Sequence, residues 1–194
     1  MQNEGKVLII GDSISMGYTP HVQEMLSGRR SVVRNEGNAG DSDNVLARLD
    51  EWLACDGDAS LIHFNCGLHD IKTPREGGDN QVPLSRYKAN LAAIVDRLVQ
   101  TGKTLVWATT TPVIYERHLR KDFDRRQEDV ESYNAAALDL MNSTGIAIDD
   151  LHAAIHAAGV EQCLSEDGVH MTGQAYELLG QTVADAIASC GGKD

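Results

Sequence analysis

Residues 7–15 read VLIIGDSIS, and this stretch decides the fold. Four consecutive apolar residues bounded by glycine and aspartate are typical of a strand that is buried on both faces. An amphipathic stretch begins at Met16, so the chain turns from this strand into a helix within a few residues. The hydroxyl of Ser13 lies in that turn.

The same alternation of strand and helix continues to the end of the chain. Apolar or β-branched runs predict strands at Val7–Ile10, Ser31–Arg34, Leu61–Asn65, Thr104–Thr109 and Ala147–Asp149. Amphipathic stretches predict helices at Met16–Leu26, Asp43–Ala54, Ser85–Thr101, Asp129–Ser143 and Thr172–Ser189. This pattern predicts an α/β fold, a three-layer α/β/α sandwich with about five parallel strands in flavodoxin-like order.

Length and composition limit the class of protein. The 194 residues predict a single domain spanning residues 1–194. Seventeen basic and 29 acidic residues give a net charge of −12, which argues against a nucleic-acid partner. No apolar run approaches the ~20 residues of a membrane span, and the first residues lack the features of a signal peptide. We therefore expect a cytoplasmic protein, or a secreted one if the chain has been trimmed, and the oligomeric state stays open.

Metal and disulfide frameworks are not indicated. The four cysteines, at positions 55, 66, 163 and 190, form no C-x-x-C pair, which argues against structural zinc. We expect reduced thiols, with a disulfide in a secreted form as the alternative. His152 and His156 have the spacing of metal ligands on a helix but no acidic third partner in a known motif, so we interpret them as part of a surface helix.

Polar residues gather where the predicted strands end. Parallel sheets of this kind bind ligands outside the carboxyl ends of their strands, so these segments are predicted to converge on one rim. They offer a hydroxyl, a glycine-rich loop, two histidines and several carboxylates, the inventory that nucleophilic acyl transfer needs. The segments are Gly11–Ser15, Asn35–Ser42, Asn65–Asp70, Thr109–Pro112 and Asp167–Thr172.

Three better-known motifs are excluded. A nucleophile elbow, G-x-S-x-G, would need glycine where Ser15 stands. The residues from Thr101 to Thr104 end like a P-loop, but the first glycine would fall at Arg97 and a strand follows instead of a helix. No G-x-G-x-x-G follows the first strand, which removes the usual dinucleotide fingerprint.

Four blocks in order resemble the SGNH hydrolase family, also called GDSL-type esterases, over nearly the whole chain. Gly11-Asp12-Ser13-Ile14 resembles the first block and Asn38-Ala39-Gly40-Asp41 the second. Gly67-Leu68-His69-Asp70 occupies the third, and Asp167-Gly168-Val169-His170 resembles the last. Softer similarities are Tyr87 with Asn90-Leu91, and Tyr133-Asn134.

The resemblance implies a serine esterase without metal or cofactor. Ser13 would be the nucleophile, and His170 the base, held by Asp167. Backbone N–H groups of Ser13 and Gly40, together with His69, would form the oxyanion hole. The substrate would be a small-molecule or carbohydrate ester; the polar rim and few aromatics lean toward a short acyl group, such as acetyl, on a polar alcohol or carbohydrate.

His69 is the one departure from the family's third block, which usually reads Gly-x-Asn-Asp. An imidazole N–H can also donate to an oxyanion, and we expect Asp70 to help orient it. The alternative role for His69 is a polar contact with substrate. Asp12 and Asp41 are expected to be structural turn formers, and Asn38 to brace its loop or contribute to the site.

Other interpretations stay open at this stage. Ser13 suits the N-cap of a helix, and Asp167 and His170 suit a helix entry and a surface histidine. His69 competes with His170 as the base. The alternative function is a catalytically weak or inactive SGNH-fold protein that binds a ligand at this rim. A flavodoxin-like cofactor or phosphoacceptor module is a further alternative, but it leaves the Asp167–His170 block unexplained.

Two long loops are expected to rise above the strand ends and shape the pocket, Lys72–Leu84 and Pro112–Glu128. The second concentrates positive charge in an acidic protein. It is either a solvated charged loop or a grip on an anionic or polyhydroxylated substrate. Its basic residues are Arg117, His118, Arg120, Lys121, Arg125 and Arg126.

Overall fold

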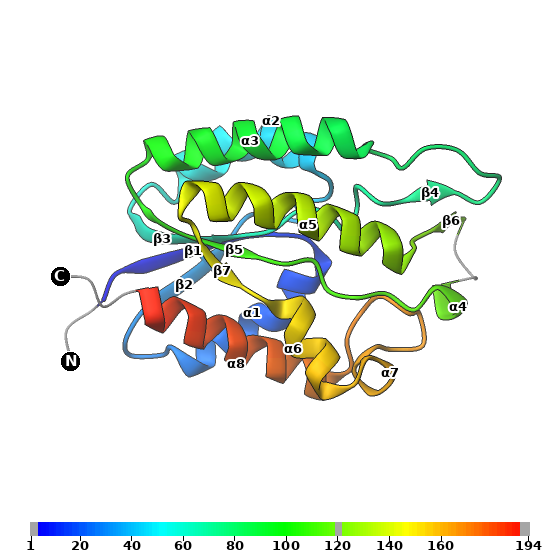
Figure 1. Cartoon of the computed structure of the whole chain (residues 1–194). Helices are drawn as coiled ribbons and strands as arrows, with labels where there is room; N and C mark the ends of the chain where they lie inside the picture. Colours follow the sequence, from blue (N-terminus) through cyan, green and yellow to red (C-terminus); the bar gives the residue numbers. More distant parts are fainter. Residues whose placement is uncertain (1–3, 119–121, 191–194) are drawn as a thin grey trace.

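The computed structural model describes residues 4–118 and 122–190. Its central sheet has five parallel strands in the order β2-β1-β3-β5-β7 (Figure 1). Counted within this sheet, the order is that of flavodoxin-like folds, which confirms the prediction. The strands are β1 (Lys6–Ile10), β2 (Ser31–Arg34), β3 (Ala59–Phe64), β5 (Thr104–Ala108) and β7 (Ala147–Asp149).

Helices cover both faces of the sheet and complete the predicted three-layer sandwich (Figure 1). One layer contains α1 (Ser13–Met25), α6 (Leu151–Ala158) and α8 (Gly173–Cys190). The other contains α2 (Ser42–Cys55), α3 (Leu84–Gln100) and α5 (Gln127–Thr144). The apolar run after Lys6 is buried between them, because Val7, Leu8 and Ile9 are fully covered. Among the described residues, no helix is both long and apolar enough to cross a membrane.

Aspartates start the first two helices, and this corrects their predicted bounds. Asp12 accepts a hydrogen bond from the Ile14 N–H at 2.9 Å, and Asp41 accepts one from the Asn44 N–H at 2.9 Å. The two residues expected to be turn formers are therefore helix caps. Helix α1 begins at Ser13, three residues before the predicted Met16. The N-cap interpretation of Ser13 is wrong, because Asp12 has that position.

The two long loops pair with each other, which the sequence did not indicate. Strand β4 (Thr73–Pro74) and strand β6 (Phe123–Asp124) form a two-stranded antiparallel sheet beyond the main one. Short helices α4 (Tyr115–His118) and α7 (Val160–Cys163) lie near the same end of the molecule (Figure 1). The pairing holds the loops together above the strand ends, where the candidate site lies.

Candidate active site

Ser13 is placed by the sharp turn from β1 into α1. It is the first residue of α1, so its N–H has no acceptor within the helix. It lies at the helix N-terminus, where the helix dipole favours negative charge. Its Oγ lies 2.9 Å from Nε2 of His170, which is 157 residues away along the chain. The turn thus presents the hydroxyl to a histidine from the other end of the sequence.

The loop 165–170 folds around the Asp167 carboxylate and so positions His170. The second ring nitrogen, Nδ1, lies 2.6 Å from Oδ2 of Asp167. Oδ1 of Asp167 accepts hydrogen bonds from the N–H groups of Val169 and His170, at 3.0 and 2.9 Å, and from the Ser165 hydroxyl at 2.9 Å. Partial burial works against ionisation, but these hydrogen bonds outweigh it and hold the pKa of Asp167 well below its usual range.

Ser13, His170 and Asp167 therefore form one continuous series of hydrogen bonds. The histidine that links Ser13 to Asp167 is His170 and not His69. Ser13, His170 and Asp167 line one cavity of about 240 Å³. It is lined by Ser13, Asn38, His69, Lys72, Phe123, Arg125, Asp167, Val169 and His170.

Contrary to what the resemblance implied, the loop after β2 does not leave the Gly40 N–H free for an oxyanion. Gly40 has a φ of +69°, a conformation that suits glycine, and its N–H donates to Oδ1 of Asn38 at 2.9 Å. The N–H expected in the oxyanion hole thus already has an acceptor. Because Asn38 is exposed, its amide can rotate and release that N–H to a ligand.

His69 lines the cavity as a neutral ring. Burial, with help from the nearby charges of Lys72 and Arg125, lowers its pKa to about 4. At pH 7 the imidazole therefore carries one N–H donor and one acceptor nitrogen. A neutral ring facing the cavity can donate to an oxyanion or to a polar substrate group, so the geometry is compatible with either predicted role.

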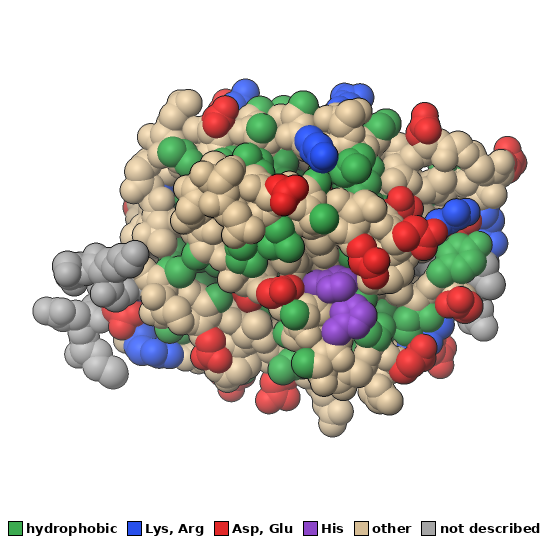
Figure 2. Space-filling model, in the orientation of Figure 1, with side chains coloured by type: hydrophobic (Ala, Val, Ile, Leu, Met, Phe, Trp, Pro, Cys, Tyr) green, Lys and Arg blue, Asp and Glu red, His purple; other side chains and the backbone are tan. Residues whose placement is uncertain are grey.

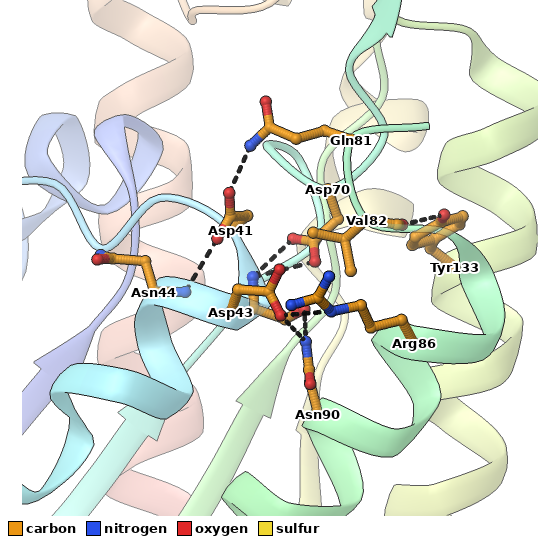
Figure 3. Close-up of polar contacts among 10 residues, drawn as sticks. Asp41, Asp43, Asn44, Asp70, Gln81, Val82, Arg86, Asn90 and Tyr133 are labelled. Carbon is orange, nitrogen blue, oxygen red and sulfur yellow. Dashed lines mark hydrogen bonds and ion pairs between the residues drawn. The ribbon is translucent and has the colours of Figure 1, made fainter. Parts of the chain in front are cut away.

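Asp70 does not show the predicted contact with the His69 side chain. Its two carboxylate oxygens instead accept the Ser42 N–H, at 3.0 and 3.1 Å, at the start of α2 (Figure 3). Asp70 is fully buried, and burial raises its pKa to about 6 despite the hydrogen bonds from Ser42. Asp70 therefore attaches the loop after β3 to the N-terminus of α2, which supplies its hydrogen-bond donor.

A polar network extends this attachment to the helices behind the loops (Figure 3). Gln81 donates to the free oxygen of Asp41, and the Tyr133 hydroxyl donates to the Val82 carbonyl at 2.6 Å. Asn90 donates to the Ser42 hydroxyl at 3.0 Å. The softer similarities at Asn90 and Tyr133 thus correspond to residues that hold the loops in place.

Two residues that position the first turn were missed by the sequence analysis. The Gly11 N–H donates to Oδ1 of Asn35 at 3.0 Å, and the Arg34 guanidinium donates to the carbonyls of Asn35 and Gly37 at 2.8 Å. Both lie at the end of β2, next to β1, so their position at a strand end was the available signal. They connect the loop before Gly40 to the turn that carries Ser13.

The basic residues of the second long loop have different roles. Arg125 is buried and lines the cavity, whereas Arg126 is exposed. Arg117 donates to the Glu161 carboxylate and to the Leu164 carbonyl, so for this residue the charged-loop interpretation holds. Arg120 and Lys121, and the side chain of His118, lie outside the described part of the structure.

His152 and His156 lie on α6, as the surface-helix interpretation predicted. Their ring centroids are 4.5 Å apart, and Figure 2 shows neighbouring histidine side chains on the molecular surface. Within residues 4–118 and 122–190, no three side chains of the metal-binding types come together. A hydrogen bond of 3.0 Å joins His152 to Gln127 instead.

The fold and the site define a doubly wound α/β protein with a Ser-His-Asp chain at its strand ends. A family model, the GDSL-like lipase/acylhydrolase family, matches residues 9–178. The chain therefore belongs to this family, and its enzyme class is ester hydrolase. A comparison with curated protein sequences gives no match.

Solved structures with this fold share little sequence with the chain. A lipase/acylhydrolase from Enterococcus faecalis has a TM-score of 0.79 and 18% identity, covering 95% of each chain. A catalytic mutant of an acetylxylan esterase from Geobacillus stearothermophilus has a TM-score of 0.77 and 16% identity, covering 96% of this chain and 95% of its own. The acetyl xylan esterase AlAXEase has a TM-score of 0.74 and 18% identity, covering 95% of this chain and 98% of its own.

Proposed function

We propose that the chain hydrolyses a carboxylic ester with Ser13 as nucleophile, His170 as general base and Asp167 as the residue that orients His170. The observation that carries this proposal is the hydrogen-bonded chain from Ser13 Oγ through both ring nitrogens of His170 to Asp167. Asp167 is ionised at neutral pH, so it holds the proton on Nδ1 and leaves Nε2 to accept the serine proton.

The reaction then proceeds in two halves. Ser13 Oγ attacks the acyl carbon while its proton passes to His170, and the protonated His170 returns the proton to the leaving alcohol. Water, activated by the same histidine, then releases the acid from the serine. The backbone N–H groups of Ser13 and Gly40 and the His69 ring donate to the oxyanion in both halves, after the Asn38 amide turns away from Gly40.

The expected substrate is a short acyl ester, such as acetate, of a polar alcohol or carbohydrate. The cavity of about 240 Å³ is small, and most of its lining side chains are polar or charged. Two structural neighbours are acetyl xylan esterases, which supports the same substrate class. A long acyl chain would find little room in a cavity of this size.

A second function is favoured by a separate observation. The Gly40 N–H already has an acceptor, and His69 stands where the family usually has asparagine. A protein with a weakened oxyanion hole would bind an ester or its product at this rim with little turnover.

The deciding experiment treats the protein with an organophosphonate serine probe, followed by intact-mass spectrometry, and measures p-nitrophenyl acetate turnover. We expect a single adduct and measurable turnover in the wild type, both lost in Ser13→Ala. Ser15→Ala is the matched control, because it removes a hydroxyl of the same turn that bonds only within the fold, to Asp12 and Arg34. No adduct and no turnover in the folded wild type would favour the ligand-binding function.

A further inference from the structure

Two cationic side chains from different loops open into the cavity that holds Ser13 and His170. Lys72 follows β3, and Arg125 follows β6. Antiparallel pairing of β4 with β6 brings the two loops together, with Thr73 opposite Asp124. The residues just outside this pair, Lys72 and Arg125, are therefore held on the same side of the cavity by backbone hydrogen bonding.

Arg125 is anchored at one end and open at the other. It is only 5% exposed, its Nε donates to the Leu68 carbonyl at 2.6 Å, and its guanidinium lies 5.0 Å from the centroid of the Phe123 ring. Its two terminal nitrogens make no hydrogen bond within the part of the chain that the structure describes. A guanidinium fixed through Nε presents these nitrogens as a fork of donors, the geometry that binds carboxylate or phosphate in pairs.

Lys72 adds a second charge without a local counter-ion. Its ammonium lies 5.2 Å from the centroid of the same Phe123 ring. It makes no ion pair with any acidic side chain in residues 4–118 and 122–190. Aspartates 12, 41, 70 and 167 influence the two cations only through longer-range attraction. Burial lowers the pKa of both groups, that of Arg125 to about 10, so the guanidinium remains charged at pH 7.

The charges of Lys72 and Arg125 are balanced only in part within the cavity, where Asp167 is the carboxylate among the lining residues. Two like charges beside one ring repel, and partial burial weakens the screening by water. A cavity lined by two cations and one carboxylate also contrasts with the chain's net charge of −12 and with the acidic side chains scattered over the face shown in Figure 2. We propose that Arg125 and Lys72 bind an anionic group, a carboxylate or a phosphate monoester, carried by the ester substrate close to its scissile bond.

This inference rests on the proposed function and narrows its substrate class. The anion would lie between the loops, within the same small cavity as Ser13, so it would hold the ester carbonyl against the nucleophile. Cations that served only the oxyanion would act on every ester alike. Selectivity between charged and neutral esters therefore separates the two roles.

The test compares kcat/KM for three acetate esters of similar shape: 3-acetoxybenzoate, 3-acetoxyphenyl phosphate and neutral 3-acetoxybenzamide. We expect the wild type to prefer at least one anionic ester by about tenfold or more, because charge-assisted hydrogen bonds are the strong ones. Lys72→Met and Arg125→Lys should each lower the ratio of anionic to neutral kcat/KM. The anionic ester whose kcat/KM falls in these variants shows whether the two cations bind a carboxylate or a phosphate. Arg126→Gln is the control, because it removes a neighbouring charge outside the cavity and should keep the ratio.

Equal kcat/KM for the three esters in the wild type, or an unchanged ratio in both variants, would overturn the inference. Arg125→Lys could fail to fold because Arg125 supports Leu68, but Lys72 makes no such bond, so Lys72→Met keeps the test open. Calorimetric binding of 3-acetoxybenzoate and 3-acetoxyphenyl phosphate to Ser13→Ala, against 3-acetoxybenzamide, needs no turnover. Equal affinity for all three would refute anion binding, whereas absence of turnover and serine adduct in the wild type would refute only the proposed catalysis.

Discussion

At the scale of single residues, the pKa of Asp167 has a direct consequence for the reaction. In the proposed mechanism its carboxylate holds the proton on Nδ1 of His170, so that Nε2 is free to accept from Ser13. Asp167→Asn keeps the size of the side chain but can donate to Nδ1 through its amide, which stabilises the opposite tautomer. We expect turnover of p-nitrophenyl acetate to fall by about 10⁴, the cost of this change in serine proteases.

The control for Asp167→Asn is thermal unfolding followed by circular dichroism. Asp167 also accepts three hydrogen bonds within its loop, so some loss of stability is expected. Unchanged turnover in a merely less stable protein would mean that Asp167 is a structural residue of the loop and not the partner of a catalytic base.

For His69, one substitution is expected to retain or raise turnover, in contrast to Asp167→Asn. If its ring donates to the oxyanion, His69→Asn restores an amide donor at that place, and turnover should be retained or rise. His69→Ala removes the donor and should lower turnover by about 10² to 10³. A loss in His69→Asn as complete as that in Ser13→Ala would show that His69 is the base or an irreplaceable contact with the substrate.

At the scale of elements, the buried contact between Asp70 and the start of α2 links protonation to stability. The pKa of Asp70 is raised to about 6, above the ~4 of an aspartate in an unfolded chain. Between these values the folded protein binds more protons than the unfolded chain. The contribution of Asp70 to stability therefore falls as the pH rises from about 4 to about 6.

Asp70→Asn should remove this pH dependence, because an amide does not titrate. The measurement is the free energy of unfolding in urea at pH 4 and at pH 7. Relative to the wild type, the variant should gain on the order of 2 to 3 kcal/mol between the two pH values, since each pKa unit corresponds to about 1.4 kcal/mol. Asp96→Asn, an exposed position on α3, is the matched control. If the free energies of unfolding of Asp70→Asn and the wild type differed by the same amount at both pH values, the raised pKa of Asp70 would be contradicted.

At the scale of the whole molecule, the site depends on how closely α1 and α8 pack. Helix α1 carries Ser13, and α8 begins just after His170, so their packing brings the two ends of the chain together (Figure 1). A Cβ added at Gly180 would lie 2.4 Å from Cβ of His21 and 3.4 Å from the Tyr18 carbonyl. Only a glycine lets the two helix backbones approach this closely.

Gly180→Ala should therefore separate the helices. We expect a loss of about 1 to 3 kcal/mol in the free energy of unfolding, the usual cost of overpacking, and lower turnover as Ser13 moves away from His170. Gly173→Ala is the control on the same helix, since a Cβ there meets nothing within 4 Å. A stability gain in Gly180→Ala, as helix propensity alone would give, would show that the helices can adjust.

Much of this architecture could be predicted from local signals. The apolar run at Val7–Ile10 and the four later runs predicted the strands of the central sheet to within two residues at each end, because a strand buried on both faces needs such runs. Periodicity predicted α1, α2, α3, α5 and α8, although the starts of α1 and α2 are set by their caps, Asp12 and Asp41. The short helices α4 and α7 were not predicted. The residues at the strand ends followed from the topology, since the carboxyl ends of parallel strands share one rim.

Sequence alone thus determined the sheet, its order and the residues that meet at its rim. The tertiary structure decided what each of them contacts: that Asp70 bonds to α2 and not to His69, that Asn38 occupies the Gly40 N–H, and that Arg125 is buried beside the cavity while Arg126 is exposed. The physical reason is the distance along the sequence over which each kind of interaction acts. Strand and helix formation depend on neighbours a few residues apart, whereas these contacts join loops that lie close together only after the sheet and its two helical layers have formed.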